Sequence, residues 1–332
     1  MSNFNTVVNI NLESPNPSRV FETFSYPGGE LQTRLNKDRG DYIINDLKSD
    51  TSVKINLTAK IRSSEDLVVL AQVCDIIRNL RDSSSNVKGD EFNLTLPYLP
   101  YGRADRRFTG DVDTIGLGVF LVLLDSIVTQ YYIDNVYTLD MHPSLEKYLK
   151  VEDHITVEKR PLVQNIEPTR FIFTAIKEAL AHAETIVWNA PVAGINLLFP
   201  DKGAYERYSN MFPKMAMESN VGSIPYRMVF CNKARNLETG EFLGFDIPDA
   251  SEFLPNAPIL IIDDICDGGG TFLGIARELD KKRIDEQRYL YVTHGIFSKG
   301  VSELVKDFEM IYTTDSFHTR GTDFGPYVKV LS

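Results

Sequence analysis

The chain has 332 residues, of which 43% are hydrophobic and 24% charged, and 35 basic against 46 acidic residues give a net charge of −11. This composition excludes a disordered chain, a collagen-like chain and a small disulfide scaffold. At about 150 residues per domain, the length predicts two domains. An acidic chain without a basic block is a poor candidate for binding nucleic acid or an anionic membrane. Small anionic substrates remain open, because they need only local positive groups or a metal.

Cysteine usage and hydropathy indicate the compartment. Cys74, Cys231 and Cys266 are far apart and have no metal-ligand spacing, which favours reduced thiols. The longest apolar run, residues 117–124, is far shorter than the roughly 20 residues of a membrane span. The N-terminus has neither a basic n-region nor an apolar h-region. We therefore expect a cytoplasmic protein without a signal peptide.

Short β-branched strands alternate with amphipathic helices along the chain. In the first half we predict strands at 7–12, 53–57, 92–96 and 135–139, and helices at 67–80 and 115–128. In the second half we predict helices at 169–182, 271–280 and 302–308, strands at 185–188, 227–231, 258–262 and 289–293, and a hairpin turn at 238–241. This alternation predicts mostly parallel sheets flanked by helices in two α/β domains. We place them at residues 1–155 and 156–332, with the last residues packing back on the first domain.

The strongest candidate site is the segment PILIIDDICDGGGTF at residues 258–272. An apolar strand there ends in two acids, and a third acid, three glycines and a threonine precede a helix. Glycines let backbone amides approach a ligand closely, and amides at a helix N-terminus form an anion site. Carboxylates beside a phosphate site can grip ribose hydroxyls or hold Mg²⁺ through water. The alternative is a plain strand-to-helix turn capped by acids.

This segment resembles the ribose-phosphate loop of type I phosphoribosyltransferases and of ribose-phosphate pyrophosphokinases, the phosphoribosyl pyrophosphate (PRPP) synthetases. The resemblance implies that Asp263 and Asp264 face the hydroxyls of ribose 5-phosphate. It also implies which residues clasp the 5-phosphate, namely Asp267, Gly268, Gly269, Gly270 and Thr271. The loop alone does not separate an enzyme that makes PRPP from one that consumes it. The fold implied is two tandem phosphoribosyltransferase-like domains.

The segment PYLPYGRADRR at residues 97–107 carries three arginines, whose forked guanidinium groups suit phosphate oxygens. It resembles the PYFPYARQDRK segment of PRPP synthetases, which plain phosphoribosyltransferases lack. That resemblance implies that Arg103 and Asp105 bind ATP, and Ala104 stands where the family usually has glutamine. From the residues alone, the three arginines fit a solvated basic patch on the surface as well as they fit a phosphate-binding site.

Two short segments carry candidate metal ligands. Asp140 and His142 are two residues apart after a predicted strand, so they would point the same way and suit a divalent cation. Their segment resembles TMDLHA of PRPP synthetases, which implies that both lie at the Mg²⁺–ATP site and that His142 also contacts ATP. FPDKGAYERY at 199–208 resembles the family's PDAGG segment, which implies a Mg²⁺ or ribose contact for Asp201. Lys202 replaces a small residue there.

The segment YPGGELQTR at residues 26–34 resembles FPDGELYVR of the same family. In the family that hairpin reaches into a neighbouring subunit and grips adenine, which implies that Tyr26 stacks on the base and Glu30 accepts from its amino group. Gly28 replaces an acidic or amide residue. A Pro-Gly turn between strands is the structural alternative. The resemblance implies a homo-oligomer, from dimer to hexamer, with a shared adenine site.

The segment MVFCNKARN at residues 228–236 resembles the family's HKxR element. Lys233 and Arg235 alternate along a strand and so face one side, which fits ordinary surface charges as well as a site. The resemblance implies that Lys233 is the catalytic lysine and Arg235 its phosphate-binding partner. YVTHGIFSKG at 291–300 is similar to the family's THGIFSG segment, which we interpret as structural support.

Taken together, these segments imply a ribose-phosphate diphosphokinase that uses Mg²⁺. It would transfer the diphosphoryl group of ATP to the anomeric hydroxyl of ribose 5-phosphate and release AMP. One alternative is a phosphoribosyltransferase that consumes PRPP. Another is a non-catalytic partner of a true synthetase, which the residues Gly28, Ala104 and Lys202 keep open.

Overall fold

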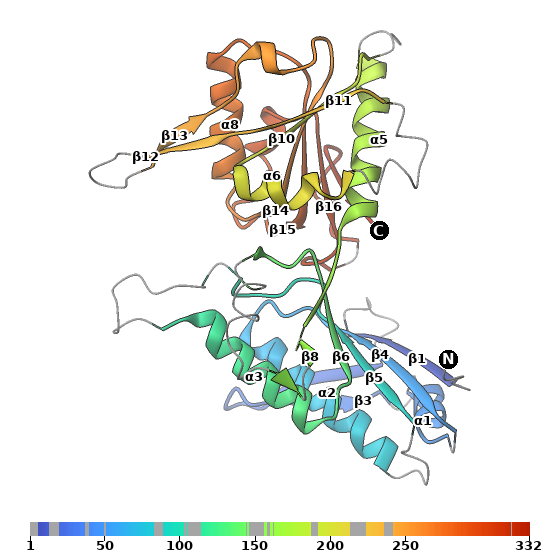
Figure 1. The fold of residues 1–332 in the computed structure, drawn as a ribbon. Coiled ribbons are helices and arrows are strands. Elements are labelled where there is room, and N and C mark those ends of the chain that lie inside the picture. The colour runs from blue at the N-terminus through green and yellow to red at the C-terminus, as the bar shows by residue number, and fades with distance from the viewer. Residues whose placement is uncertain are drawn as a thin grey trace. The chain divides into compact units, whose positions relative to one another are not determined.

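The computed structural model in Figure 1 divides into two compact units, Met1–Glu167 and Pro168–Ser332. The structure describes residues 6–12, 20–36, 40–49, 51–82, 89–102, 104, 114–143, 145, 156–157, 160–161, 163–186, 192–212, 224–235, 242–319 and 321–332. The predicted boundary at 155/156 adjoins residues outside these ranges, and it stays a prediction. Within these ranges, no helix is both long and apolar enough to cross a membrane.

The first unit is built on a sheet of five parallel strands in the order β1-β4-β5-β6-β9. These strands are β1 (Thr6–Asn11), β4 (Val53–Thr58), β5 (Glu91–Thr95), β6 (Asn135–Leu139) and β9 (Gln164–Ile166). The helices are α1 (Asp41–Leu47), α2 (Ser64–Asp82) and α3 (Gly116–Gln130), and two hairpins join β2 (Phe21–Ser25) to β3 (Leu31–Leu35) and β7 (Thr156–Val157) to β8 (Arg160–Pro161). Apolar residues of one sheet face and of the three helices form a single core.

A ladder of amide side chains crosses the other face of this sheet. Asn56 Nδ2 donates to Asn9 Oδ1 over 2.9 Å, and Asn93 Nδ2 donates to Asn56 Oδ1 over 3.1 Å. Asn135 donates to Asn93 over 2.8 Å, and Gln164 donates to Asn135 over 3.1 Å. Because each strand donates to its neighbour, side chains as well as the backbone fix the register of all five strands.

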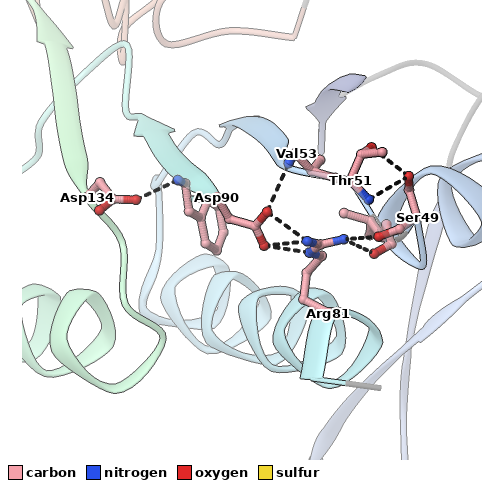
Figure 2. A network of polar contacts seen from close by, with 8 residues as sticks. Ser49, Thr51, Val53, Arg81, Asp90 and Asp134 are labelled. Atoms are coloured by element: carbon pink, nitrogen blue, oxygen red, sulfur yellow. Dashed lines mark hydrogen bonds and ion pairs between the residues drawn. The ribbon is translucent and has the colours of Figure 1, made fainter. Parts of the chain in front are cut away.

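A buried ion pair joins the ends of four elements in the first unit (Figure 2). The Arg81 guanidinium donates from Nε and Nη2 to both oxygens of Asp90, each over 2.7 Å. Its Nη1 donates to the carbonyl oxygens of Leu47 and Ser49, and Asp90 also accepts the N–H of Val53. The Arg81 side chain is only 3% exposed. The pair therefore fastens the C-terminal ends of α1 and α2 to the beginnings of β4 and β5.

The second unit is built on a sheet of six parallel strands in the order β11-β10-β14-β15-β16-β17. They are β10 (Ile195–Phe199), β11 (Tyr226–Phe230), β14 (Ile259–Cys266), β15 (Arg288–Gly295), β16 (Met310–Thr314) and β17 (Val328–Leu331). The helices are α5 (Thr169–Ile186), α6 (Lys202–Ser209) and α8 (Gly270–Lys281), and β12 (Asn232–Arg235) pairs with β13 (Phe242–Asp246) in a hairpin. The chain moves from β10 to β11 on one side and then returns to add β14 on the other, so the strand order reverses between β10 and β14.

Three predicted elements of the second unit differ from the structure. The strand predicted at 185–188 is wrong at Thr185 and Ile186, which belong to α5, while residues 187 and 188 lie outside the described residues. The predicted helix at 302–308 is a single 3-10 turn, η4 (Leu304–Lys306), since the chain must already enter β16 at Met310. The strand predicted at 258–262 runs on to Cys266. The predicted turn at 238–241 lies outside the described residues.

Candidate active site

The predicted sugar site lies where the strand order of the second sheet reverses. Asp201 follows the end of β10, and the neighbouring strand β14 carries Asp263 and Asp264 near its carboxyl end. In open parallel sheets, ligands bind outside the carboxyl ends of the strands at such a switch point. The fold therefore brings three carboxylates from two sequence segments to the place where a ligand is expected.

Asp201 is held by its role at the beginning of α6. Its backbone is extended, with φ of −160°, and its Oδ1 accepts the N–H of Ala204 over 2.9 Å. This is the geometry of a helix N-cap, in which one side-chain oxygen satisfies an otherwise unpaired amide. The cap fixes the direction of the carboxylate at the end of β10.

The two adjacent acids of β14 have different partners. Asp263 Oδ1 accepts the N–H of Asp264 over 2.9 Å, while Asp264 Oδ2 accepts from Arg207 Nη1 over 3.1 Å. The side chains of Arg207 and Asp264 are 12% and 9% exposed, so this is a largely buried ion pair. Burial, followed by the negative charges of Asp264 and Asp201, raises the pKa of Asp263 well above its usual value.

Arg207 is a site residue that the sequence analysis missed. It lies on α6, six residues after Asp201, in the segment 199–208, whose resemblance to the family pointed only to Asp201. The sequence contains one hint of this contact, because a short helix that directly follows β10 is expected to lie near β14, the neighbouring strand of the sheet. No spacing rule, however, pairs a helical arginine with an acid 57 residues later.

The glycine-rich turn joins β14 to α8. Gly269 is the N-cap of α8 with φ of +78°, a left-handed conformation that side-chain-bearing residues rarely adopt. A Cβ on Gly269 would also lie 3.2 Å from the Leu304 side chain, whereas one on Gly270 would meet nothing within 4 Å. The first amides of a helix lack intrahelical acceptors and carry the positive end of its dipole. The turn from Asp267 to Thr271 therefore has the backbone chemistry of an anion site.

In the first unit, the structure brings two of the predicted nucleotide-binding segments together. A Cβ on Gly102 would lie 3.1 Å from His142 Cβ, so Gly102 of the first segment lies beside His142 of the second. Asp140 is buried and has φ of +50°, and β6 ends at Leu139. The strand alternation used to orient Asp140 and His142 therefore does not extend to them. Arg103 and Asp105 lie outside the described residues.

Tyr26 and Glu30 flank the turn of the β2–β3 hairpin. The N–H of Tyr26 donates to the Glu30 carbonyl over 2.9 Å, and Gly29 takes φ of +90° between them. Tyr26 is 48% exposed, and its ring lies 5.5 Å from that of Phe24 in an edge-on arrangement. An exposed aromatic side chain at the tip of a hairpin is available to stack on a flat ring.

Lys233 and Arg235 lie on β12, the strand that precedes the hairpin turn. Lys233 pairs with Phe245, and Arg235 pairs with Phe242, with a register shift between Ala234 and Arg235. That shift interrupts the simple alternation from which the sequence argument placed both side chains on one face. The structure describes the backbone of these two residues and not their side chains.

The candidate metal ligands are divided between the units. Asp140 and His142 belong to the first unit and Asp201 to the second. In the described part of each unit, no three His, Cys, Asp or Glu side chains form a group that would hold a metal ion. Mg²⁺ that enters with a nucleotide needs only one or two protein carboxylates, because phosphates and water supply its other ligands. The carboxylates of Asp140 and Asp201 fit that chemistry.

The chain is similar to several ribose-phosphate pyrophosphokinases. It is 27% identical over 236 residues to the protein of Pyrococcus abyssi, an alignment covering 68% of this chain and 65% of that protein. It is 21% identical over 296 residues to the Bradyrhizobium diazoefficiens protein, covering 85% and 80%, and 22% identical over 321 residues to ribose-phosphate pyrophosphokinase B of Dictyostelium discoideum, covering 91% and 87%. No family model matches the sequence.

The fold is similar to that of a solved structure of a phosphoribosylpyrophosphate synthetase. Phosphoribosylpyrophosphate synthetase from Mycobacterium smegmatis aligns with a TM-score of 0.61 at 14% identity, over 98% of this chain and 94% of that one. The predicted fold class, two tandem phosphoribosyltransferase-like α/β domains, is thereby confirmed.

Proposed function

We propose that the chain makes PRPP from ATP and ribose 5-phosphate, because it is similar to several ribose-phosphate pyrophosphokinases. The anomeric hydroxyl of the sugar attacks the β-phosphorus of ATP, a new oxygen–phosphorus bond forms, and the bond between the α- and β-phosphates breaks. AMP leaves and the hydroxyl proton is released. The observation that carries this proposal is the cluster of Asp201, Asp263 and Asp264 beside a glycine turn at the switch point of the second sheet.

In this proposal, the second unit binds the sugar. Backbone N–H groups of the turn from Asp267 to Thr271 donate hydrogen bonds to the 5-phosphate at the N-terminus of α8. Asp264, oriented by Arg207, accepts hydrogen bonds from the ribose hydroxyls. Asp263, whose pKa is raised by burial and by the charges of Asp264 and Asp201, faces the same hydroxyls.

In the same proposal, residues of the first unit bind the nucleotide. His142, Arg103 and Asp105 contact ATP. From the second unit, Lys233 and Arg235 of the β12–β13 hairpin neutralise charge on the diphosphoryl group as it is transferred. Such catalysis is mainly positioning and charge stabilisation, as in phosphoryl transfer generally. What supports these assignments is the contact of His142 with the Gly102 segment and the position of Lys233 on a hairpin strand.

We further propose that Mg²⁺ enters with ATP, and that its candidate protein ligands are Asp140 and His142 in the first unit and Asp201 in the second. When bound, it supplies charge neutralisation on the phosphates. The protein side of this role is a buried carboxylate at Asp140 and a capped, oriented carboxylate at Asp201.

The exposed hairpin tip supports a homo-oligomer with shared sites. In this proposal, Tyr26 and Glu30 of one subunit contact the adenine bound by another, as the family resemblance implies. Tyr26 is exposed and lies at the tip of a two-stranded hairpin, which is the geometry that an arm reaching toward a partner needs.

The direct test is AMP formation by the purified chain with ATP, Mg²⁺ and ribose 5-phosphate. We expect AMP and PRPP in equal amounts, with AMP formation dependent on the sugar phosphate. Formation of ADP in place of AMP would contradict the proposal. A chain that forms no product alone but alters the rate of another synthetase would be a regulatory partner instead.

A further inference from the structure

Lys299 lies on a segment that is fastened to the glycine turn. After β15, the N–H groups of Ile296 and Phe297 both donate to the carbonyl of Cys266, over 2.8 and 3.1 Å. The N–H of Ser298 donates to the carbonyl of Asp267 over 3.1 Å. Three backbone hydrogen bonds therefore hold the chain just before Lys299 against the first residues of the turn.

The aliphatic stem of Lys299 runs beside the turn itself. A Cβ placed on Gly268 would lie 3.4 Å from both Cδ and Cε of Lys299. The ammonium nitrogen is one bond beyond Cε, and Lys299 is exposed, so its end is free to move toward a ligand. A lysine in this position covers apolar surface with its stem and keeps its charge available.

The charge of Lys299 is available for a ligand. Among the described residues, Lys299 makes no ion pair, whereas Lys281, Lys282, Lys306 and Lys329 of the same unit each pair with a carboxylate.

The surroundings of the turn are rich in negative charge. Asp201, Asp263, Asp264 and Asp267 lie on the strand ends and turn of the proposed sugar site, and the Arg207 guanidinium is bound to Asp264. A sugar phosphate carries nearly two negative charges at neutral pH. A cation beside the phosphate would reduce the repulsion between the phosphate and the ionised carboxylates.

We propose that Lys299 is a binding residue for the 5-phosphate of the sugar substrate, pairing with the phosphate held by the amides of the glycine turn. This inference rests on the proposed function and adds to it a side-chain contact that the backbone site does not supply. The THGIFSG segment that this stretch resembles contains no lysine. Lys299 therefore adjusts the affinity of this chain for phosphorylated sugars.

The test compares Lys299→Met and Lys299→Arg with Lys306→Met as a matched control. Lys306 is also exposed, lies seven residues further on and pairs with Glu303, away from the turn. Calorimetric titration with ribose 5-phosphate alone, at low and high salt, gives Kd without turnover. We expect Lys299→Met to raise Kd about tenfold, as for one hydrogen bond to a charged group, and to weaken its salt dependence. Lys299→Arg and Lys306→Met should stay near wild type.

Steady-state kinetics separates this inference from the proposed function. Lys299→Met should raise KM for ribose 5-phosphate while kcat stays close to wild type, and inorganic phosphate should compete less well for the variant. Unchanged Kd and KM in an active Lys299→Met variant overturn the role of Lys299 and leave the proposed function intact. A wild-type chain that neither binds nor converts ribose 5-phosphate overturns the proposed function, and the role of Lys299 with it.

Discussion

At the scale of single residues, the adjacent acids of β14 behave differently because their surroundings differ. Asp264 has a guanidinium partner, whereas Asp263 has burial and two neighbouring negative charges, which together raise its pKa. The sequence alone predicts both acids at a sugar site but does not distinguish them. The difference arises from tertiary contacts, namely the burial of Asp263 near Asp201 and the ion pair of Asp264 with Arg207 on α6.

Asp263 makes the stability of the free protein depend on pH. Between the usual value of 3.8 and the raised pKa, the folded protein keeps a proton that the unfolded chain has released, so stability falls as pH rises through this window. Asp263→Asn does not titrate and should melt at a higher temperature than wild type at pH 8 in EDTA. The difference should shrink toward pH 4. Equal melting temperatures of wild type and Asp263→Asn at pH 8 would contradict the raised pKa. The control is Asp285→Asn, which makes the same substitution at an exposed acid.

Replacing Arg207 alone should lower the free energy of unfolding more than replacing Arg207 and Asp264 together. Arg207→Met removes a cation from beside Asp264, which is only 9% exposed, and removing one member of a buried pair costs about 3–5 kcal/mol. Arg207→Met with Asp264→Asn should recover part of that loss, because the buried negative charge is removed as well. Urea denaturation measures all three free energies of unfolding. A double variant no more stable than Arg207→Met would show that the pair is not coupled.

At the scale of elements, the Arg81–Asp90 pair shows what burial adds to an ion contact. Arg81 is 3% exposed and joins four element ends, so Arg81→Met should destabilise the protein by about 3–5 kcal/mol. Arg34 pairs with Glu22 at a similar distance, but their side chains are 67% and 40% exposed. Arg34→Met should therefore cost about 1 kcal/mol or less. Similar losses for both variants by urea denaturation would refute the buried role.

Two neighbouring glycines of the turn should differ in how they tolerate a methyl group. Gly269→Ala forces a left-handed alanine, costing about 1–2 kcal/mol, and brings Cβ within 3.2 Å of Leu304. Gly270 begins α8 and has open space, so Gly270→Ala should leave the free energy of unfolding unchanged or raise it. Thermal and urea unfolding of the two variants checks this. Equal losses of unfolding free energy in the two variants would contradict a special requirement for glycine at the left-handed position 269.

The fold class and the glycine turn follow from the sequence because both are local in the chain. β-branched runs, helical periodicity and the Asp-Gly-Gly-Gly-Thr order act over a few residues, and β14 followed by α8 is where they predict it. Errors arise where tertiary context decides. The chain after β15 stops at one 3-10 turn because β16 begins at Met310, and α5 extends through Thr185 despite its β-branched end. The ladder from Asn9 to Gln164 depends on strand register, which no local pattern specifies.

At the scale of the whole molecule, the proposed function and the exposed hairpin tip lead to one expectation about assembly. If Tyr26 of one subunit completes the adenine site of another, Tyr26→Ala and Lys233→Ala should complement each other. Each variant alone should be nearly inactive, with Lys233→Ala reduced about 10²-fold as for loss of one transition-state donor. Mixed oligomers, co-expressed with two different tags and purified through both, should regain activity. Activity no higher than the average of the two variants would place Tyr26 in the site of its own subunit.

The central claim is that the turn after β14 binds the terminal phosphate of a pentose. A crystal structure of the wild-type protein with ribose 5-phosphate tests it most directly. We predict the phosphate at the amides of residues 267–271 and the ribose hydroxyls at Asp263 and Asp264. A sugar phosphate bound elsewhere, with that turn empty, would contradict the claim.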